Sequence, residues 1–208
     1  MKRCVIFGGA EMADESRIRA ALRPDDFILC CDSGLRYAER LHLRPSLIVG
    51  DFDSHAKPET ETEVIALPRE KDDTDTVYAA REAVRRGFEE FLLIGVTGRR
   101  FDHTFGNVSL LLWLDKMGKK ARILDDYSEM EIVSGSPAEI GGEFPYFSLL
   151  NISGTARGIT IRGAKYPLDN AEIRSDYQYG ISNEVLPGQT ASVTVREGCL
   201  LLVKVFAG

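Results

Sequence analysis

The chain has 208 residues, a length that fits one large domain or two smaller ones. Apolar residues make up 44% and charged residues 28%, which indicates a folded globular protein and excludes a disordered one. The formal net charge of -6 argues against general binding to nucleic acids, because their phosphate backbones require a basic protein face. Metal ions and cationic ligands suit this charge better.

The first part of the chain alternates short apolar runs with helical patterns. Strands are predicted at CVIFG, FILCC, SLIVG, EVIAL, FLLIG and ARILD, which begin at residues 4, 27, 46, 63, 91 and 121. Helices are predicted between some of them, over about residues 16–22, 35–43, 75–86 and 103–117. This alternation predicts a parallel sheet covered by helices, a Rossmann-like α/β domain over residues 1–126.

The residue pattern of the sequence changes after about Tyr127. Short runs rich in β-branched residues follow, separated by Gly and Pro: EIVSG, FSLLNIS, GITIRG, QTASVTVREG and CLLLVKVF. Since no helical pattern appears there, we predict an all-β domain over residues 127–208, an antiparallel sandwich or a barrel-like form. No long linker separates the two parts.

Cysteine usage and apolar run lengths indicate the compartment. Cys4, Cys30, Cys31 and Cys199 form no C-x-x-C pair and lie mostly in apolar runs, so we expect buried, reduced thiols. No signal-peptide pattern and no run long enough to span a bilayer is present. We therefore expect a cytoplasmic protein without membrane contacts.

Aspartates follow four of the predicted strands. Because the carboxyl ends of parallel strands converge at one edge of a sheet, these side chains should gather at one rim. Such carboxylates repel one another unless a cation compensates, and Mg²⁺ prefers oxygen ligands. Any single aspartate here could equally be a turn or helix cap, but the set together indicates a site. Its members are Asp32, Asp51, Asp53, Asp72, Asp73, Asp75 and Asp102.

The rim lacks the usual phosphate-binding loops. Gly8 and Gly9 would let a phosphate or base approach the backbone, but neither G-x-G-x-x-G nor a P-loop occurs. An enzyme that uses a nucleoside triphosphate would need the metal cluster and Lys71, Arg99 and Arg100 instead. Thr74 or Asp75 could cap the next helix, a role compatible with binding phosphate.

The ordered motifs resemble those of thiamine pyrophosphokinases. GDFDS at 50–54, KDDTDT at 71–76 and GRRFDH at 98–103 are similar, in order and approximate spacing, to the nucleotide and metal motifs of that family. GAKYPL at 163–168 followed by GISNE at 180–184 is similar to its thiamine-binding segment. The resemblance covers nearly the whole chain.

The resemblance implies a role for each matched position. The implied Mg²⁺ ligands are Asp51, Asp53, Asp72 and Asp75, and the implied catalytic set adds Arg100 and Asp102. The nucleotide-binding candidates are Lys71 and Thr74, together with Asp32, Arg99 and His103. The implied thiamine-binding residues are Tyr166, Ser182 and Asn183. The resemblance also implies a homodimer whose sites combine the α/β domain of one subunit with the β domain of the other.

Several of these positions also have a structural interpretation. A tyrosine before Pro167 is usually a packing residue, and Ser182 with Asn183 could form a turn or cap. His103 could equally serve the start of a helix. Read without the resemblance, these residues would stay structural.

The implied reaction is the attack of the thiamine hydroxyl on the β-phosphorus of ATP, which gives thiamine diphosphate and AMP in one in-line step. Rate should come from positioning and from neutralising phosphate charge, with Asp75 or Asp102 accepting the hydroxyl proton. The alternatives are another Mg²⁺-dependent nucleotide transferase and a non-catalytic sensor of metal or nucleotide. Release of AMP indicates pyrophosphoryl transfer, whereas release of pyrophosphate indicates a nucleotidyltransferase. Turnover of either kind excludes the sensor.

Overall fold

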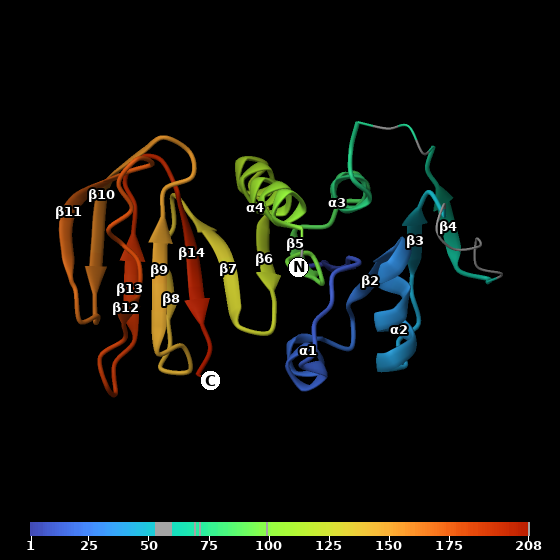
Figure 1. Cartoon of the computed structure of the whole chain (residues 1–208), viewed down its shortest axis with the longest axis horizontal. Coiled ribbons are helices and arrows are strands. Elements are labelled where there is room, and N and C mark those ends of the chain that lie inside the picture. The colour runs from blue at the N-terminus through green and yellow to red at the C-terminus, as the bar shows by residue number, and fades with distance from the viewer. Residues whose placement is uncertain (53–59, 69, 71, 99, 208) are drawn as a thin grey trace. The chain divides into compact units, whose positions relative to one another are not determined.

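A computed structural model describes residues 1–52, 60–68, 70, 72–98 and 100–207. The chain divides into two units, Met1–Asp126 and Tyr127–Gly208 (Figure 1). Within the described ranges, no helix is long and apolar enough to cross a membrane.

Six parallel strands form the sheet of the first unit, as the sequence predicts. Their order across the sheet is β6-β5-β1-β2-β3-β4, and each neighbouring pair is parallel. The inner strands are buried on both faces, which explains their continuous apolar runs. The bounds are β1 Arg3–Phe7, β2 Phe27–Cys31, β3 Leu47–Gly50, β4 Glu63–Ala66, β5 Glu90–Ile94 and β6 Lys120–Leu124.

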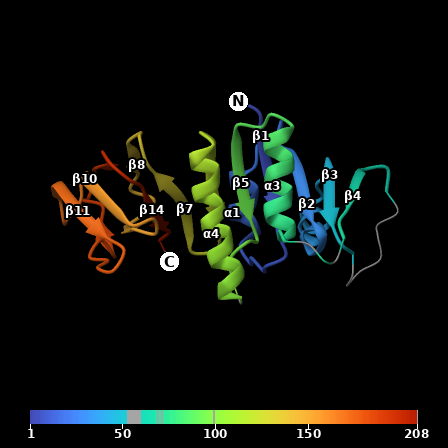
Figure 2. The same cartoon turned by 90° about the horizontal axis from the view of Figure 1, so that it is seen from above.

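Four α-helices connect these strands, close to the predicted positions: α1 Glu15–Ala21, α2 Leu35–Leu41, α3 Asp75–Arg85 and α4 Phe101–Lys116. A short 3-10 helix, η1 Asp32–Gly34, precedes α2. The start of α4 differs from the prediction by two residues, because the Thr104 backbone N–H already bonds to the Arg100 carbonyl. Figure 2 shows α3 and α4 side by side, and the two helices contact each other.

The strand order creates a crevice between β1 and β5. From β1 the chain proceeds outward through β2 and β3 to β4, and it then returns through α3 to β5 on the other side of β1. The loops that follow β1 and β5 therefore leave the sheet in opposite directions. In open α/β sheets ligands bind at such a switch point, outside the carboxyl ends of the strands.

Gly8 allows these two loops to approach closely. Its backbone N–H donates to the Ile94 carbonyl at 2.8 Å. A Cβ atom on Gly8 would lie 2.6 Å from the Gly95 carbonyl oxygen and 2.9 Å from a Val96 methyl group. Only a residue without a side chain fits between β1 and β5 here.

Replacing Gly8 by Ala is expected to destabilise the protein by about 1–3 kcal/mol, because backbone atoms of Gly95 cannot move away as a flexible side chain could. The free energy of unfolding, measured by urea denaturation, tests this. Gly106→Ala is the control, since nothing lies within 4 Å of the added methyl group on α4. If both variants are as stable as the parent, the close approach carries no constraint.

The second unit consists of two antiparallel sheets, and its described residues contain no helix. The first sheet has the order β12-β9-β14-β7 and the second β11-β10-β13-β8. The bounds are β7 Ser128–Val133, β8 Ala138–Ile140, β9 Tyr146–Leu150, β10 Thr155–Arg162, β11 Leu168–Arg174, β12 Asn183–Glu184, β13 Ala191–Thr194 and β14 Leu200–Val205.

Both sheets contribute to one hydrophobic core. Phe147 and Leu202 come from the first sheet, and Ile161 and Val193 from the second. The predicted runs correspond to β7, β9, β10, β13 and β14. The patterns did not indicate β8 and β12, which are only 3 and 2 residues long, or β11, whose residues are mostly polar.

Candidate active site

Two of the predicted aspartates emerge side by side from β2 and β3. The register pairs Cys31 with Val49, so that Asp32 and Asp51 follow adjacent strand ends. Gly50 ends β3 directly before Asp51, and a Cβ atom added to it would lie 3.0 Å from the Asp32 Cβ atom. Both aspartates are half-buried. The carboxyl ends of β2 and β3 thus bring two carboxylates to one edge of the sheet.

Asp75 joins them from the start of α3. It is the first residue of that helix, and the preceding Thr74 caps the helix by accepting a hydrogen bond from the Val77 N–H at 3.4 Å. The helix that Asp75 begins contacts β2 and β3, the two strands that Asp32 and Asp51 follow. Burial, and after it the negative charge of Asp75, raises the pKa of the Cys31 thiol at the end of β2.

The other residues predicted for this site have different surroundings. Asp72 is exposed, whereas Asp73 forms an ion pair with Arg81 at 2.7 Å. Asp53, Lys71 and Arg99 lie outside the described residues.

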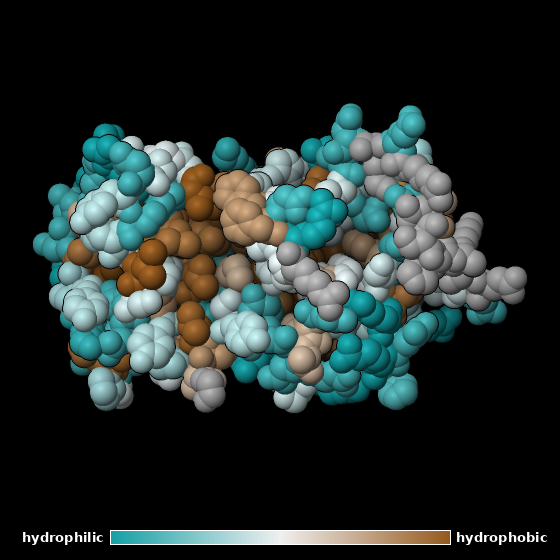
Figure 3. All heavy atoms as spheres, in the orientation of Figure 1, coloured by the Kyte–Doolittle hydropathy of each residue, from teal (hydrophilic) through white to brown (hydrophobic). Residues whose placement is uncertain are grey.

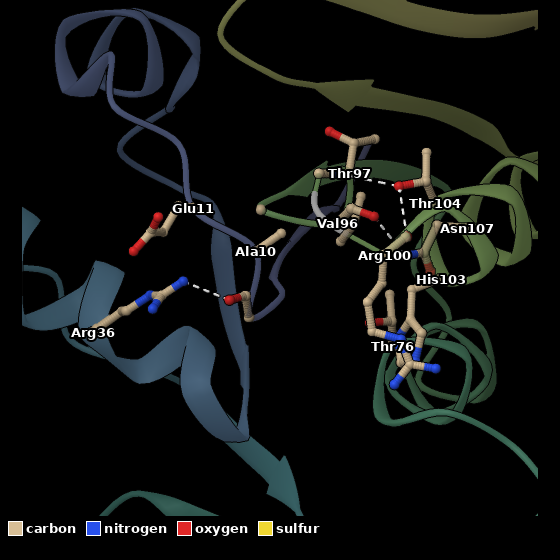
Figure 4. Close-up of a pocket in the computed structure, with 13 residues that line it drawn as sticks. Ala10, Glu11, Arg36, Thr76, Val96, Thr97, Arg100, His103, Thr104 and Asn107 are labelled. Atoms are coloured by element: carbon tan, nitrogen blue, oxygen red, sulfur yellow. Dashed lines mark hydrogen bonds between the residues drawn. The ribbon is translucent and has the colours of Figure 1, made fainter.

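A cavity of about 300 Å³ lies at the switch point between β1 and β5. The segments 9–11 and 95–98 line it, together with Arg36 of α2 and residues at the start of α4. Figure 4 shows Arg36 and Glu11 on one side of the cavity and Arg100 and His103 on the other. Two arginines and two backbone loops thus surround a space that an anionic ligand could enter.

Hydrogen bonds from side chains hold the loops of this cavity. Arg36 donates to the Gly9 carbonyl at 2.5 Å, and the Tyr37 hydroxyl donates to the Ala10 carbonyl. On the opposite side, the buried Asn107 side chain donates to the Val96 carbonyl at 2.7 Å. Neither Arg36 nor Asn107 is among the residues predicted from sequence motifs. For Arg36, a signal existed in its place one helical turn after Asp32.

Arg100 and Asp102 form a two-pronged ion pair at the start of α4. The Arg100 Nε and Nη2 atoms donate to the two Asp102 carboxylate oxygens at 3.1 and 2.5 Å. The hydrogen bond from Arg100 lowers the pKa of Asp102 to about 2. Asp102 is therefore ionised at neutral pH and is a weak proton acceptor. Beside it, His103 lines the cavity.

The donor atoms at this edge suit Mg²⁺. Among the residues that the structure describes, no three His, Cys, Asp or Glu side chains are grouped closely enough to enclose a metal ion. Mg²⁺ does not require such an enclosure, because it is usually held by one or two carboxylates together with water and substrate phosphates. The carboxylate oxygens of Asp51 and Asp75 fit that requirement.

In the second unit, Asn183 joins the predicted thiamine-binding residues to one another. Its side chain is buried and donates to the Tyr166 carbonyl at 2.8 Å, while its Oδ1 atom accepts from the Tyr166 N–H at 3.0 Å. Tyr166 itself is 58% exposed, and Ser182 is exposed with a φ of 57°. The Asn183 amide thus holds the backbone of the exposed tyrosine.

Replacing Asn183 by Ala is expected to cost about 1–3 kcal/mol, because the Tyr166 backbone groups would lose buried partners. Thermal unfolding followed by circular dichroism measures the loss. Ser182→Ala is the control, since the bond that Ser182 makes to Ser148 uses its backbone N–H. Equal stability of the two variants would contradict the structural role of Asn183.

Two family descriptions match this chain in order. Residues 18–123 match "Thiamin pyrophosphokinase, catalytic domain". Residues 136–200 match "Thiamin pyrophosphokinase, vitamin B1 binding domain". The first match falls in the α/β unit and the second in the all-β unit.

Individual proteins are also similar. The thiamine pyrophosphokinase of Bacillus subtilis is 29% identical over 163 residues, which are 74% of this chain and 76% of the relative. The solved structure from Geobacillus thermodenitrificans is 27% identical with a TM-score of 0.83, covering 100% of this chain and 99% of the other. The Bacillus subtilis structure shares the fold, with a TM-score of 0.88 at 22% identity and 100% coverage of both chains. Because the catalytic-domain match alone spans more than half of the sequence, the chain belongs to the thiamine pyrophosphokinase family.

Proposed function

We propose that this protein transfers the pyrophosphoryl group of ATP to the hydroxyl of thiamine, giving thiamine diphosphate and AMP. The observation that carries the proposal is the presence, on one chain and in order, of the catalytic and the vitamin B1 binding domains of the family. The carboxylates at the ends of β2 and β3, beside a cavity with basic walls, are the groups that such a transfer needs.

The two domains divide the work in this proposal. The domain over residues 1–126, a Rossmann-like fold, binds ATP and Mg²⁺, and the β-sandwich over residues 127–208 binds thiamine. The crevice at the switch point supports the first assignment, since nucleotides bind there in open α/β sheets. The single core shared by two sheets supports the sandwich.

The nucleotide enters the cavity between segments 9–11 and 95–98 in this proposal. Arg36 and Arg100 line that cavity and attract the phosphates, and His103 and Thr104 add polar groups at the start of α4. Lys71 and Arg99, outside the described residues, are further candidates for binding phosphate oxygens. Thr74 fixes the start of α3, whose N-terminal dipole also favours negative charge.

The Mg²⁺ ligands in this proposal are Asp51, Asp53, Asp72 and Asp75, with Asp32 beside them. When bound, the ion neutralises negative charge on the phosphate oxygens. Several aspartates can then share one rim without strong repulsion.

Asp75 is the remaining candidate for accepting the hydroxyl proton. Arg100 holds the pKa of Asp102 at about 2, so Asp102 is a weak proton acceptor. Asp102 instead orients Arg100, whose guanidinium stabilises charge that develops on the transferred group.

Thiamine binds to the second domain through Tyr166, Ser182 and Asn183 in this proposal. Tyr166 is exposed, and its ring can stack on a ligand ring. The Lys165 Nζ atom lies over the same ring, 5.6 Å from its centre. The Asn183 amide already bonds to the Tyr166 backbone, so it positions the tyrosine as well as any ligand.

A homodimer, with sites that combine domains of two subunits, is also part of the proposal. One face of the β9-β14-β7 sheet carries mostly apolar side chains. Ile132, Leu201 and Leu150 form one cross-strand row, and Met130, Val203 and Ser148 form the next. Leu201 is buried, whereas Ile132, Leu150, Met130 and Val203 are half-buried. Figure 3 shows hydrophobic residues gathered around β9 and β14. An antiparallel sheet usually turns a polar face to water, so a face of this kind favours a partner.

Replacing Val203 by Glu is expected to shift the protein from dimer to monomer, because the charge would have to be buried in the apolar interface. Sedimentation equilibrium measures the mass of the assembly. The control is Ser192→Glu, a change at a half-buried position on β13 of the other sheet. A parent protein that sediments as a monomer would overturn the dimer.

The reaction itself is tested by incubating the purified protein with ATP, Mg²⁺ and thiamine and separating the products by chromatography. Equimolar AMP and thiamine diphosphate are expected. Release of pyrophosphate would indicate nucleotidyl transfer, and binding without turnover would indicate a sensor.

A reducing compartment such as the cytoplasm suits the four free cysteines.

A further inference from the structure

Arg81 connects the aspartate loop that precedes α3 to the neighbouring helix α4. Its Nη1 atom lies 2.7 Å from the Oδ2 atom of Asp73. Its guanidinium carbon lies 5.9 Å from the centre of the Trp113 ring on α4. One side chain therefore contacts the loop in front of α3 and an aromatic residue of the helix packed beside it.

This contact distinguishes Asp73 from the other aspartates of the loop. Asp73 is half-buried and bound to Arg81, which lies between one and two helical turns beyond the start of α3. Asp72 is exposed, and Asp75 begins α3, a helix that contacts β2. The loop thus carries three carboxylates within four residues, and Arg81 neutralises one of them.

We propose that Arg81 is a positioning residue for the proposed transfer reaction, on which this inference rests. By binding Asp73 on the flank of α3 and packing against Trp113, it fixes the loop so that Asp72 and Asp75 present their carboxylates to Mg²⁺ and the phosphates. Thr74 stands between these aspartates as the helix cap. The loop is therefore held at two points, the cap and the ion pair.

Stability alone does not explain this arrangement. The Arg81 side chain is 55% exposed, and ion pairs at that exposure contribute little to the free energy of unfolding. Reaction rates are far more sensitive, because a small displacement of a ligand group changes the geometry of the reacting atoms. A role in positioning therefore predicts a large effect on metal binding and a small one on thermal stability.

Arg85 provides a matched control on the same helix. It lies four residues beyond Arg81 and is also exposed, but its partner is Glu82 within α3. Removing its side chain changes the charge of the helix by the same amount without affecting the loop.

The test uses Arg81→Ala, Arg81→Lys, Asp73→Asn and the double variant that combines Arg81→Ala with Asp73→Asn. Arg85→Ala is the control. The first readout is the affinity for Mn²⁺, used as a paramagnetic substitute for Mg²⁺, in the presence of a non-hydrolysable ATP analogue. The second is amide hydrogen exchange over residues 72–77. The third is the Mg²⁺ dependence of kcat/KM.

For Arg81→Ala we expect about a tenfold loss of Mn²⁺ affinity and of kcat/KM, with faster exchange over residues 72–77. The melting temperature should fall by no more than about 4 °C. Asp73→Asn should lose Mn²⁺ affinity and kcat/KM to the same extent as Arg81→Ala. The double variant should lose no more than either single variant, because both changes remove the same ion pair. Arg81→Lys should recover part of the lost affinity. Arg85→Ala should match the parent protein.

Mn²⁺ affinity and kcat/KM within about twofold of the parent for Arg81→Ala would overturn the proposal. Additive losses in the double variant would also overturn it, as would loss of turnover in Asp73→Asn alone, which would make Asp73 a ligand. Turnover by the unsubstituted protein reports separately on the proposed function. Mn²⁺ affinity and amide exchange report on Arg81 even if that turnover is absent.

Discussion

Replacing Asp75 by Asn is expected to lower kcat by about 10²–10⁴-fold while the protein keeps its fold, because the amide can neither accept the hydroxyl proton nor carry charge toward Mg²⁺. The change preserves the size of the side chain at the first position of α3. Single-turnover measurements at saturating ATP and thiamine give the rate of the chemical step. Circular dichroism confirms that the variant is folded.

Asp25→Asn is the matched control for this experiment. Asp25 is exposed and precedes β2, whereas Asp32 follows it, so the control alters the opposite edge of the same sheet. Its rate should equal that of the parent. Near-normal turnover by the Asp75 variant would remove Asp75 from the catalytic set. Partial recovery at high Mg²⁺ would assign it to metal binding and not to proton transfer.

Replacing Arg100 by Ala is expected to lower kcat by about 10²–10³-fold, because the transferred group would lose a charged hydrogen-bond donor. Stability should hardly change, since both side chains of the Arg100–Asp102 pair are more than 60% exposed. Steady-state kinetics and thermal unfolding separate the two effects.

The second unit offers a control with the same local geometry. Arg174 binds Asp176, two residues further on, through contacts of 2.9 and 2.5 Å, and both side chains are similarly exposed. Arg174→Ala removes an equivalent pair that belongs to the second unit and includes none of the residues proposed to bind the nucleotide. If both variants lose activity equally, the effect of Arg100 is general and not catalytic.

Several features of the candidate site could be predicted from the sequence because they depend on local pattern. The inner strands β1, β2, β3 and β5 are buried, and their continuous apolar runs predict strands directly. Once those strands are parallel, Asp32 and Asp51 must emerge at one edge. The quoted motifs likewise indicated the family, which the matches to both domains confirm.

Other features depend on contacts between residues far apart in the chain. The Arg36 contact with Gly9 and the Asn107 contact with Val96 arise only when α2 and α4 pack beside the β1 and β5 loops. Strands such as β12 exist because a neighbouring strand supplies their hydrogen bonds, and two residues carry no pattern of their own.

The aspartate loop before α3 combines features that depend on local sequence with features that depend on tertiary contacts. Its sequence determines that Asp72, Asp73 and Asp75 stand at the start of a helix, since Thr74 caps that helix locally. The ion pair of Asp73 with Arg81, and the contact of Arg81 with Trp113 of another helix, arise only in the folded protein. Spacing along the chain specifies which residues are available, whereas tertiary packing decides the direction of each side chain, because partners in space select among rotamers that the local sequence leaves open.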